Sequence, residues 1–599
     1  MLQPSNRLTL IDAMRPPAGY AFAEAMAVTF TLDLRALLAA PAAFALTASA
    51  GEVVDASDST TEPVELLHAI RRHASNLTVF SQAGEISLPP SRKVFAFFEQ
   101  AVIPVLAPRH GVVHPKVWVL RYTADEAPDR LRVLSASRNL TFDTSWDTLL
   151  RLDSTDDGDP RATSLAPLAD LFRQLESCVV AGPLGQVHHE RVQRLAAALE
   201  RTPFALPSGV DRLEVHVLGF GATSVLPHPV DRSLVISPFV SADFLTDVHP
   251  GAVHELVSRP SALDALDDAA LAHVGTPYVF DDGSAPEVER SEASLSAEDP
   301  GRPLRGLHAK VFAYETGDRA QVFVGSANAT GAAFTSNVEI LFELQGPRQR
   351  LGIDALLTSS KDELGLRRLF QTYVRGPDET AADTSSSLDA VRRALGRLPI
   401  TGTATPNGDG AWVVRYQTEE PITLPDGVVG ECWPLAAAGN RTALRPGLPL
   451  DASFVVSLES ISGFLAVELT ELATNVVTGF AVPVQLVGMP EERDRHLLRS
   501  LIGSAERFLR YLLALLTERG AAGGLEAHEL ADALEGAGST RAAGPTLPVL
   551  EVLLRSLRTD PTRILAIDPL VQDLAADDAL PAGFSEIWRL LRDLAEVPT

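Results

Sequence analysis

The stretch HAKVFAYETGDRAQVFVGSAN, residues 308–328, decides the fold of this chain. Two apolar runs rich in Val and aromatic residues flank a polar turn, and this pattern predicts a β-hairpin. Because residues i and i+2 of a strand point to one face, His308 and Lys310 should project together. The second strand ends in Gly-Ser-Ala-Asn, which should place Ser326 and Asn328 beside that pair.

A second copy of this hairpin lies earlier in the chain. It reads HPKVWVL at 114–120 and LRVLSASRN at 131–139, so that His114 and Lys116 are followed by Asn139. Each copy comes after an apolar strand that leads into a helix, at 27–40 and 234–247, and after a further strand near 77–80 and 254–257. This repetition, with helices and strands alternating, predicts two similar α/β halves.

The use of lysine supports a chemical role for the two copies. Only four of the 51 Lys and Arg residues are lysines, and two of the four lie in the His-x-Lys pairs. An ammonium group binds phosphate as a compact point charge, whereas Arg acts as a planar fork. A single His-x-Lys is common by chance, but two copies that each precede Ser-x-Asn indicate a functional site.

The two motifs resemble those of the phospholipase D superfamily, in which His-x-Lys and an acidic residue precede Gly-Ser-x-Asn. The resemblance covers roughly residues 20–345. It implies two phospholipase D-like α/β half-domains that pack around a pseudo-twofold axis and share one site. It also implies that one imidazole attacks phosphorus while the other protonates the leaving oxygen. We assign His114 as the nucleophile and His308 as the acid, with the reverse order as the alternative.

The resemblance implies roles for the remaining motif residues. Lys116, Lys310, Asn139 and Asn328 would hold the non-bridging phosphate oxygens, without a metal ion or another cofactor. Two later carboxylates, Asp147 and Glu339, would each accept a hydrogen bond from a catalytic histidine, with Ser137 and Ser326 as further supporting residues. No His, Cys, Asp and Glu group with metal-ligand spacing is evident in the sequence.

The first motif departs from the family pattern at two positions. Arg121 stands where the second motif has Glu315, and Ala136 stands where it has Gly325. These departures leave open whether the first motif is fully active.

Composition limits the partners that the chain can bind. The formal net charge is -26, whereas a protein that binds nucleic acid over a broad surface is normally basic. A polyanionic substrate would therefore need a narrow cationic site or a partner protein. Two cysteines, no secretory signal and no segment able to span a bilayer predict a cytoplasmic protein without a membrane contact.

Changes in composition divide the chain into five regions. Residues 376–395 are polar and acidic at their start and read as a linker. We expect a protein partner or self-association through residues 390–599, which carry no catalytic pattern. The predicted regions are a first half (1–205), a second half (206–375), the linker (376–395), a small β-rich domain (396–490) and a helical C-terminal domain (491–599).

Three functional classes fit these features. We favour a metal-independent nuclease with a phosphohistidine intermediate. Residues 134–152 resemble phospholipase D-like proteins of bacterial defence or helicase-linked gene clusters, which implies a role in antiphage defence. The alternatives are a soluble lipid phosphodiesterase, which would need an apolar interfacial patch, and a non-catalytic scaffold that binds phosphate.

Overall fold

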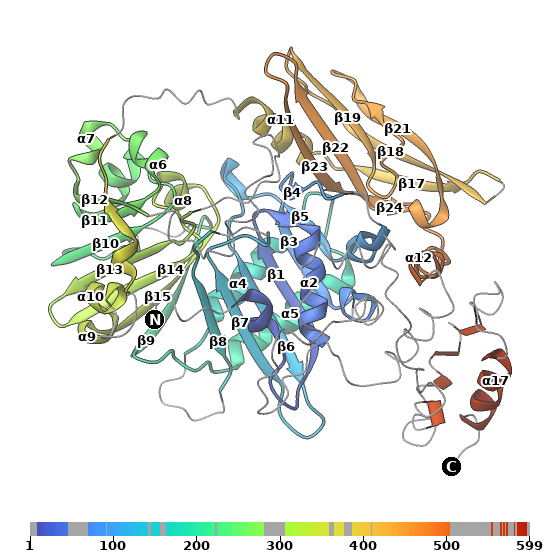
Figure 1. The fold of residues 1–599 in the computed structure, drawn as a ribbon, viewed down its shortest axis with the longest axis horizontal. Coiled ribbons are helices and arrows are strands. Elements are labelled where there is room, and N and C mark those ends of the chain that lie inside the picture. Colours follow the sequence, from blue (N-terminus) through green and yellow to red (C-terminus); the bar gives the residue numbers. More distant parts are fainter. Residues whose placement is uncertain are drawn as a thin grey trace, which may run out of the picture.

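The computed structural model describes most of the chain up to residue 502 and short pieces beyond it. The described ranges are 9–45, 70–90, 93–141, 145–155, 163–221, 225–280, 306–358, 365–375, 386–408 and 410–502, then 553–554, 564–565, 567–568, 571–572, 580 and 584–595. Figure 1 shows one mixed sheet at the centre, a second at the left and a β-sandwich at the upper right. The predicted α/β class is confirmed in this coarse sense.

The central sheet has the strand order β5-β3-β1-β6-β7-β8. Its strands are β1 (Ala21–Thr29), β3 (Leu77–Gln82), β5 (Val102–Val105), β6 (Val117–Thr123), β7 (Arg130–Ala136) and β8 (Leu149–Asp153). The first three strands run parallel to one another, and β6, β7 and β8 follow as antiparallel neighbours.

The second sheet repeats this order strand for strand, as β12-β11-β10-β13-β14-β15. As in the central sheet, three parallel strands are followed across the sheet by three antiparallel ones. Strands β16 and β9 are added at the two edges. The strands are β9 (Arg212–Leu218), β10 (Arg232–Ile236), β11 (Val253–Ser258), β12 (Val274–Phe280), β13 (Val311–Thr316), β14 (Arg319–Gly325), β15 (Glu339–Pro347) and β16 (Phe370–Thr372). The sequence repeat is therefore also a repeat of topology.

Helices cover both faces of the central sheet, which explains why β1 is apolar on both sides. Ala25 and Ala27 belong to one core with α2 (Leu34–Ala45), while Met26 and Val28 belong to another with α4 (Ala166–Glu176) and α5 (Gln186–Arg201). This second core also contains buried side chains of the second sheet. The two sheets are thus joined through a common apolar interior.

The far face of the second sheet packs against several short helices. These helices are η3 (Phe244–Val248), α6 (Pro260–Asp264), α7 (Asp268–Leu271) and α8 (Gly331–Thr335), with α9 (Arg348–Leu351) and α10 (Ile353–Leu357) near the end of β15. The other short helices in the described part of the first 375 residues are α1 (Leu10–Met14), η1 (Lys93–Phe98), η2 (Pro108–His110) and η6 (Leu366–Leu369).

A β-sandwich follows the two halves. One sheet has the order β21-β18-β17-β24, and the other the order β2-β4-β23-β22-β19-β20. The strands after residue 400 are β17 (Thr401–Pro406), β18 (Ala411–Pro421), β19 (Val428–Pro434), β20 (Thr442–Ala443), β21 (Pro449–Ser457), β22 (Phe464–Glu471), β23 (Val476–Pro483) and β24 (Gln485–Val487), with η7 (Leu458–Ser460) between β21 and β22. Two strands of the second sheet, β2 (Leu32–Asp33) and β4 (Ile86–Ser87), come from the first half, and β4 pairs with β23.

Part of the predicted linker is helical. Residues 376–385 lie outside the described part, but residues 386–395 belong to α11 (Ser386–Gly396). The spacing of Leu388, Val391 and Leu395 places one apolar face against the sandwich, where all three are buried. Beyond the sandwich, the described helices are α12 (Arg493–Ile502) and α17 (Phe584–Ala595). None of the described helices has the length and apolar character needed to cross a membrane.

Candidate active site

The two hairpins deliver their motif residues to equivalent places. β6 begins directly after Lys116, and β13 begins directly after Lys310. Antiparallel pairing returns the chain along β7 and β14, so that Asn139 and Asn328 each follow the end of the returning strand. Each half thus presents a His, a Lys and an Asn at one end of its sheet.

Two short parallel bridges join the halves at this end and reveal their symmetry. Val113 pairs with Val338, and Leu307 pairs with Trp146. The amide of His114 donates to the carbonyl of Val338 at 2.9 Å, and the amide of His308 donates to that of Trp146 at 2.8 Å. The segment that carries the predicted carboxylate of each half therefore lies beside the histidine of the other half, as a pseudo-twofold axis requires.

Glu339 orients His114 across this boundary. Its Oε2 lies 2.9 Å from Nδ1 of His114, and the Glu339 side chain is fully buried. Ser326 Oγ donates to the same carboxylate oxygen. A proton on Nδ1 leaves the lone pair of His114 on Nε2, which is the form that a nucleophilic imidazole needs. The sequence placed Glu339 in the second half, and only the structure shows that it acts on the first motif.

His308 has a different partner. Nζ of Lys310 lies 3.1 Å from Nδ1 of His308. A charged ammonium can only donate, and it therefore favours the neutral tautomer of His308 with the proton on Nε2. The counterpart carboxylate, Asp147, forms an ion pair with Arg138, whose Nε is 3.4 Å away. The two histidines therefore favour opposite tautomers.

Both motif lysines are buried. Lys116 is 3% exposed and Lys310 is 1% exposed, and each donates to the carbonyl oxygen of its own histidine, at 2.6 Å and 2.8 Å. Burial lowers the pKa of Lys116 well below its usual value, opposed by the Glu339 carboxylate and reinforced by the charge of Lys310. Binding of an anion would favour the charged form of both lysines.

Burial also keeps the two imidazoles neutral. It lowers the pKa of His114 to about 4, with Glu339 acting in the opposite direction and Lys116 adding to the decrease. Burial lowers the pKa of His308 as well, and its cationic surroundings lower it further: Lys310, Lys116 and Arg259, followed by His114. These mutual effects place both motifs in one electrostatic cluster.

The asparagine and serine side chains of the two motifs differ in their hydrogen bonding. The side-chain oxygens of Asn139 and Asn328 are buried without a hydrogen-bond partner among the described residues. A buried amide left unpaired is costly, which fits groups held ready for a ligand. By contrast, Ser137 Oγ accepts from the amide of Thr148 at 2.8 Å and Ser326 Oγ from that of Ile340 at 3.0 Å. The serines thus tie each asparagine turn to the segment that bears the carboxylate.

The two departures in the first motif lie away from this cluster. Glu315 Oε1 accepts from the amide of Ile353 at 2.8 Å, and its other oxygen pairs with Arg348. Arg121, at the equivalent position, pairs instead with Glu24 at 2.8 Å. In the second half, Glu315 therefore stabilises the end of β13 that lies away from the site. In the first half the same position is basic, and Arg121 forms an ion pair with Glu24 instead.

Sequence reasoning missed three residues beside the site. The ring of Phe30 lies 5.2 Å from the ring of His114 and 5.8 Å from Nζ of Lys116. Arg259 Nε donates to the carbonyl of Leu307 at 2.9 Å, and Gln82 accepts from the amide of Val113 at 2.8 Å. Each of the three follows or ends one of the parallel strands β1, β3 and β11, and that position is the signal that could have found them.

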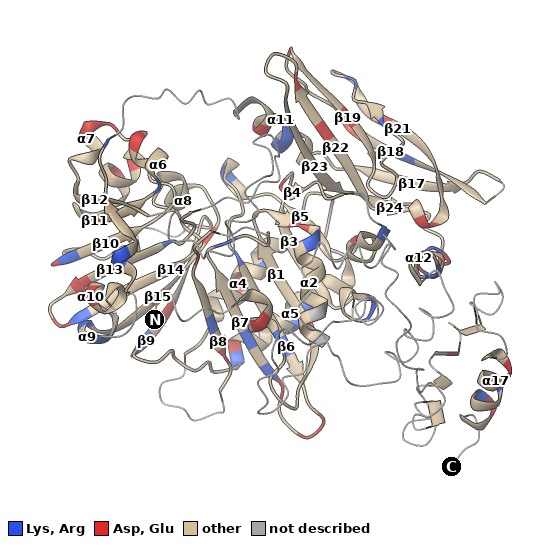
Figure 2. Ribbon diagram, in the orientation of Figure 1, with Lys and Arg blue, Asp and Glu red and all other residues tan. Residues whose placement is uncertain are grey.

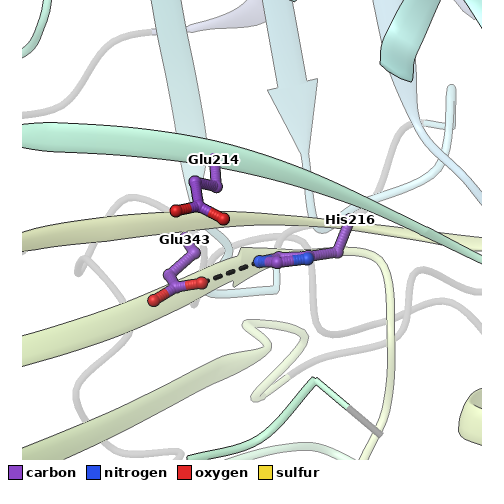
Figure 3. Close-up of side chains that lie close together, drawn as sticks. All are labelled: Glu214, His216 and Glu343. Carbon is purple, nitrogen blue, oxygen red and sulfur yellow. Dashed lines mark hydrogen bonds and ion pairs between the residues drawn. The ribbon is translucent and has the colours of Figure 1, made fainter. Parts of the chain in front are cut away.

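A separate cluster of possible metal ligands lies on neighbouring strands β9 and β15. Figure 3 shows Glu214, His216 and Glu343, whose ligand atoms lie within 4.8 Å of one another. Sequence spacing could not reveal this group, because its members meet only through strand pairing. His216 Nε2 is 2.7 Å from Glu343, Glu214 pairs with Arg212 at 2.6 Å, and two glutamine amides donate to Glu343. These hydrogen bonds and ion pairs account for the cluster without an ion.

Comparisons with known proteins give distant likenesses. No family model matches the chain, and no curated protein matches it. Among solved structures, a mutant of yeast tyrosyl-DNA phosphodiesterase matches with a TM-score of 0.32 and 10% identity, over 62% of this chain and 96% of that one. Polyphosphate kinase from Porphyromonas gingivalis matches with a TM-score of 0.29 and 12% identity, over 64% and 49%. At these scores, function has to be inferred from the site itself.

Proposed function

We propose that this protein is a phosphodiesterase of the phospholipase D type. The observation that carries the proposal is the meeting of two His-x-Lys motifs at the boundary of two pseudo-symmetric halves, with both lysines buried and His114 hydrogen-bonded to the buried Glu339. Such a site combines a nitrogen nucleophile, a proton donor and two cations for the phosphate oxygens.

The first step of the proposed reaction starts at His114. Its Nε2 forms a bond to phosphorus as the bond from phosphorus to the leaving oxygen breaks. The bound phosphodiester anion favours the imidazolium form of His308, so this ring takes up a second proton from solvent when the substrate binds, and the leaving oxygen then takes the Nε2 proton of the imidazolium. Lys116, Lys310 and the two asparagine side chains hold the non-bridging oxygens.

The second step returns the protein to its starting state. His308, now neutral, takes a proton from water as the water oxygen attacks the phosphohistidine. The bond between phosphorus and His114 breaks, the phosphomonoester product leaves, and His308 returns its extra proton to solvent. The hydrogen bond of Glu339 favours this order of roles, because it prepares Nε2 of His114 for attack.

We further propose that the substrate is a nucleic acid and that the protein acts in bacterial defence from the cytoplasm. The support is the narrow cationic cluster within a chain of net charge -26, since only a local site can then attract a polyanion. In the view of Figure 2, Arg is interspersed with Asp and Glu on the outer helix α17. The alternatives are a soluble lipid phosphodiesterase and a non-catalytic scaffold.

A parallel assay tests the proposal. Purified protein is incubated with single-stranded DNA, duplex DNA, RNA and phosphatidylcholine vesicles, and each reaction is repeated with His114→Asn. Cleavage of a nucleic acid that His114→Asn abolishes is the expected result. Cleavage of phosphatidylcholine alone would favour the lipid enzyme, and inactivity on all four substrates would favour the scaffold.

A further inference from the structure

One aromatic side chain stands out on the described surface. Phe239 is 47% exposed, and no other Phe, Tyr or Trp among the described residues is exposed. The guanidinium of Arg259 lies 5.0 Å from the centre of its ring. The attraction between the guanidinium and the ring quadrupole stabilises this arrangement while the ring stays exposed.

The loop that carries Phe239 lies directly beside the active-site asparagine of its half. Ser237 Oγ accepts from the amide of Ala329, the residue after Asn328, and the amide of Ser241 donates back to the carbonyl of Ala329, both at 3.0 Å. Val240 and Ala329 also form a parallel bridge. Phe239 is thus held close to Asn328, which the proposed mechanism places against the phosphate.

Arg259 links the ring of Phe239 to the segment that precedes His308. It follows β11, and its Nε donates to the carbonyl of Leu307, the residue before His308. Its charge also contributes to the lowered pKa of His308. The pair formed by Phe239 and Arg259 therefore lies at the edge of the site, on the side of the proposed general acid.

The pseudo-symmetry shows that the fold does not require this pair. Val28 and Ile236 pair with equivalent residues of β6 and β13, so Thr31 is the counterpart of Phe239. The same hydrogen bond confirms the match, because Thr29 Oγ1 donates to the carbonyl of Thr31 as Ser237 Oγ donates to that of Phe239.

The counterpart of Arg259 follows from the same register. The strand pairings match Phe80 with Val257, which makes Gln82 the equivalent of Arg259. Gln82 binds the backbone of Val113 just as Arg259 binds that of Leu307, so either side chain can perform this structural task. An arginine and an exposed aromatic ring on one side alone indicate a function beyond folding.

We propose that Phe239 and Arg259 form a stacking subsite for an unpaired nucleobase next to the scissile phosphate, so that the substrate is single-stranded nucleic acid. This inference rests on the proposed function and names its substrate class. A base in a duplex has both faces covered by its neighbours, whereas an unpaired base can stack on a side chain. Arg259 adds a cation that contacts either the base or the adjacent phosphate.

Binding of labelled oligonucleotides tests the subsite independently of catalysis. The full chain carrying His114→Asn binds a fluorescent single-stranded oligonucleotide, and anisotropy gives the dissociation constant. Adding Phe239→Ala should weaken binding about tenfold or more, as loss of one stacked base implies, and Phe239→Trp should preserve it. Thr31→Ala, the matched change in the other half, should have no effect.

An oligonucleotide with abasic positions tests whether the Phe239 ring acts on a base. If the ring acts on a base, Phe239→Ala should weaken binding of the normal oligonucleotide much more than that of an abasic one. Equal losses for both, no loss, or no binding of single strands at all would overturn the subsite. Weaker binding of phosphatidylcholine vesicles with unchanged oligonucleotide binding would assign Phe239 to a lipid chain instead. Base-dependent binding without cleavage by the wild type would refute the proposed nuclease but retain the subsite.

Discussion

At the scale of single residues, the two motifs are similar in sequence but not in environment. His114 faces the buried carboxylate of Glu339, while His308 faces the ammonium of Lys310. A carboxylate beside one ring nitrogen favours a proton on that nitrogen, whereas an ammonium donates a hydrogen bond to it and favours the unprotonated form. This difference supports the assignment of His114 as nucleophile.

Replacing either histidine by asparagine should abolish cleavage. Because the two act as one unit, His114→Asn, His308→Asn and the double variant should each lose on the order of a thousandfold or more, without additivity. Substrate binding should survive, since Lys116 and Lys310 remain. Acid-labile labelling of the protein should persist only where His114 is present. Wild-type cleavage by both single variants would refute the mechanism.

The pH dependence of the first step should report the lowered pKa of His114. In His308→Asn, a phosphodiester with a p-nitrophenol leaving group needs no acid, so the burst depends on neutral His114 alone. The imidazole loses its proton as pH rises through about 4, so the burst rate should rise there and stay level from pH 5 to 8. A midpoint near the ordinary histidine pKa, about 6.5, would contradict the buried site.

Glu339→Gln gives a matched test of orientation. The carboxylate raises the pKa of His114, so its removal should move the same midpoint to lower pH. The burst should also slow by about ten- to a hundredfold, because the amide fixes the tautomer less well. A merely structural role of Glu339 would leave the midpoint unchanged.

Chelation should leave cleavage intact, because the proposed nucleophile is nitrogen rather than metal-bound water. We expect equal rates with and without excess EDTA. The cluster of Glu214, His216 and Glu343 supplies the control, since its atoms are close enough for an ion. The opposite result would be that EDTA abolishes cleavage, that zinc restores it in the wild type, and that zinc does not restore it in His216→Ala. This result would assign a metal to that cluster and require another mechanism.

At the scale of elements, the end of β14 shows why one half needs glycine. A Cβ on Gly325 would lie 2.2 Å from the carbonyl oxygen of Ile340 in the neighbouring strand, too close for any side chain. The first half has Ala136 at the equivalent end of β7. The two hairpins share a topology but not the same spacing to the strand that follows.

Gly325→Ala should therefore disturb both the fold and the site. Overpacking against backbone typically costs about 1–3 kcal/mol, and the shift of β15 would move Glu339 away from His114. We expect a lower midpoint of urea unfolding and slower cleavage. Ala136→Gly, the reverse change in the other half, should cost only about 0.5–1 kcal/mol and leave the rate unchanged. Equal effects of the two changes would be inconsistent with this difference in spacing.

At the scale of the whole molecule, the C-terminal part is built into the first half. β4 pairs with β23, and Trp433 and Phe464 belong to the same core as Phe95 and Phe98. A buried ion pair joins the same regions, with Arg493 Nη1 2.6 Å from Glu99. The predicted docking of a partner or a second copy through residues 390–599 stays a prediction.

Arg493→Leu should lower the free energy of unfolding strongly. Both side chains of the pair are under a tenth exposed, so the change leaves the Glu99 carboxylate buried without its cation. Such a loss costs about 3–5 kcal/mol, measured by urea unfolding. Adding Glu99→Gln should restore much of the stability, because no buried charge is then left alone. A double variant as unstable as the single one would show that Arg493 acts by packing.

The sequence by itself determined the repeat, the α/β class and the identity of the two motif triads. These follow from local patterns: strand periodicity, turn residues and the spacing between His, Lys and Asn. Only the tertiary structure decided that Glu339 serves His114 of the opposite half and that Phe239 and Arg259 meet beside His308. It also decided that part of the predicted linker is helix and that β2 and β4 extend the sandwich. Such contacts join residues far apart in the chain, and no local periodicity encodes which of them will pair.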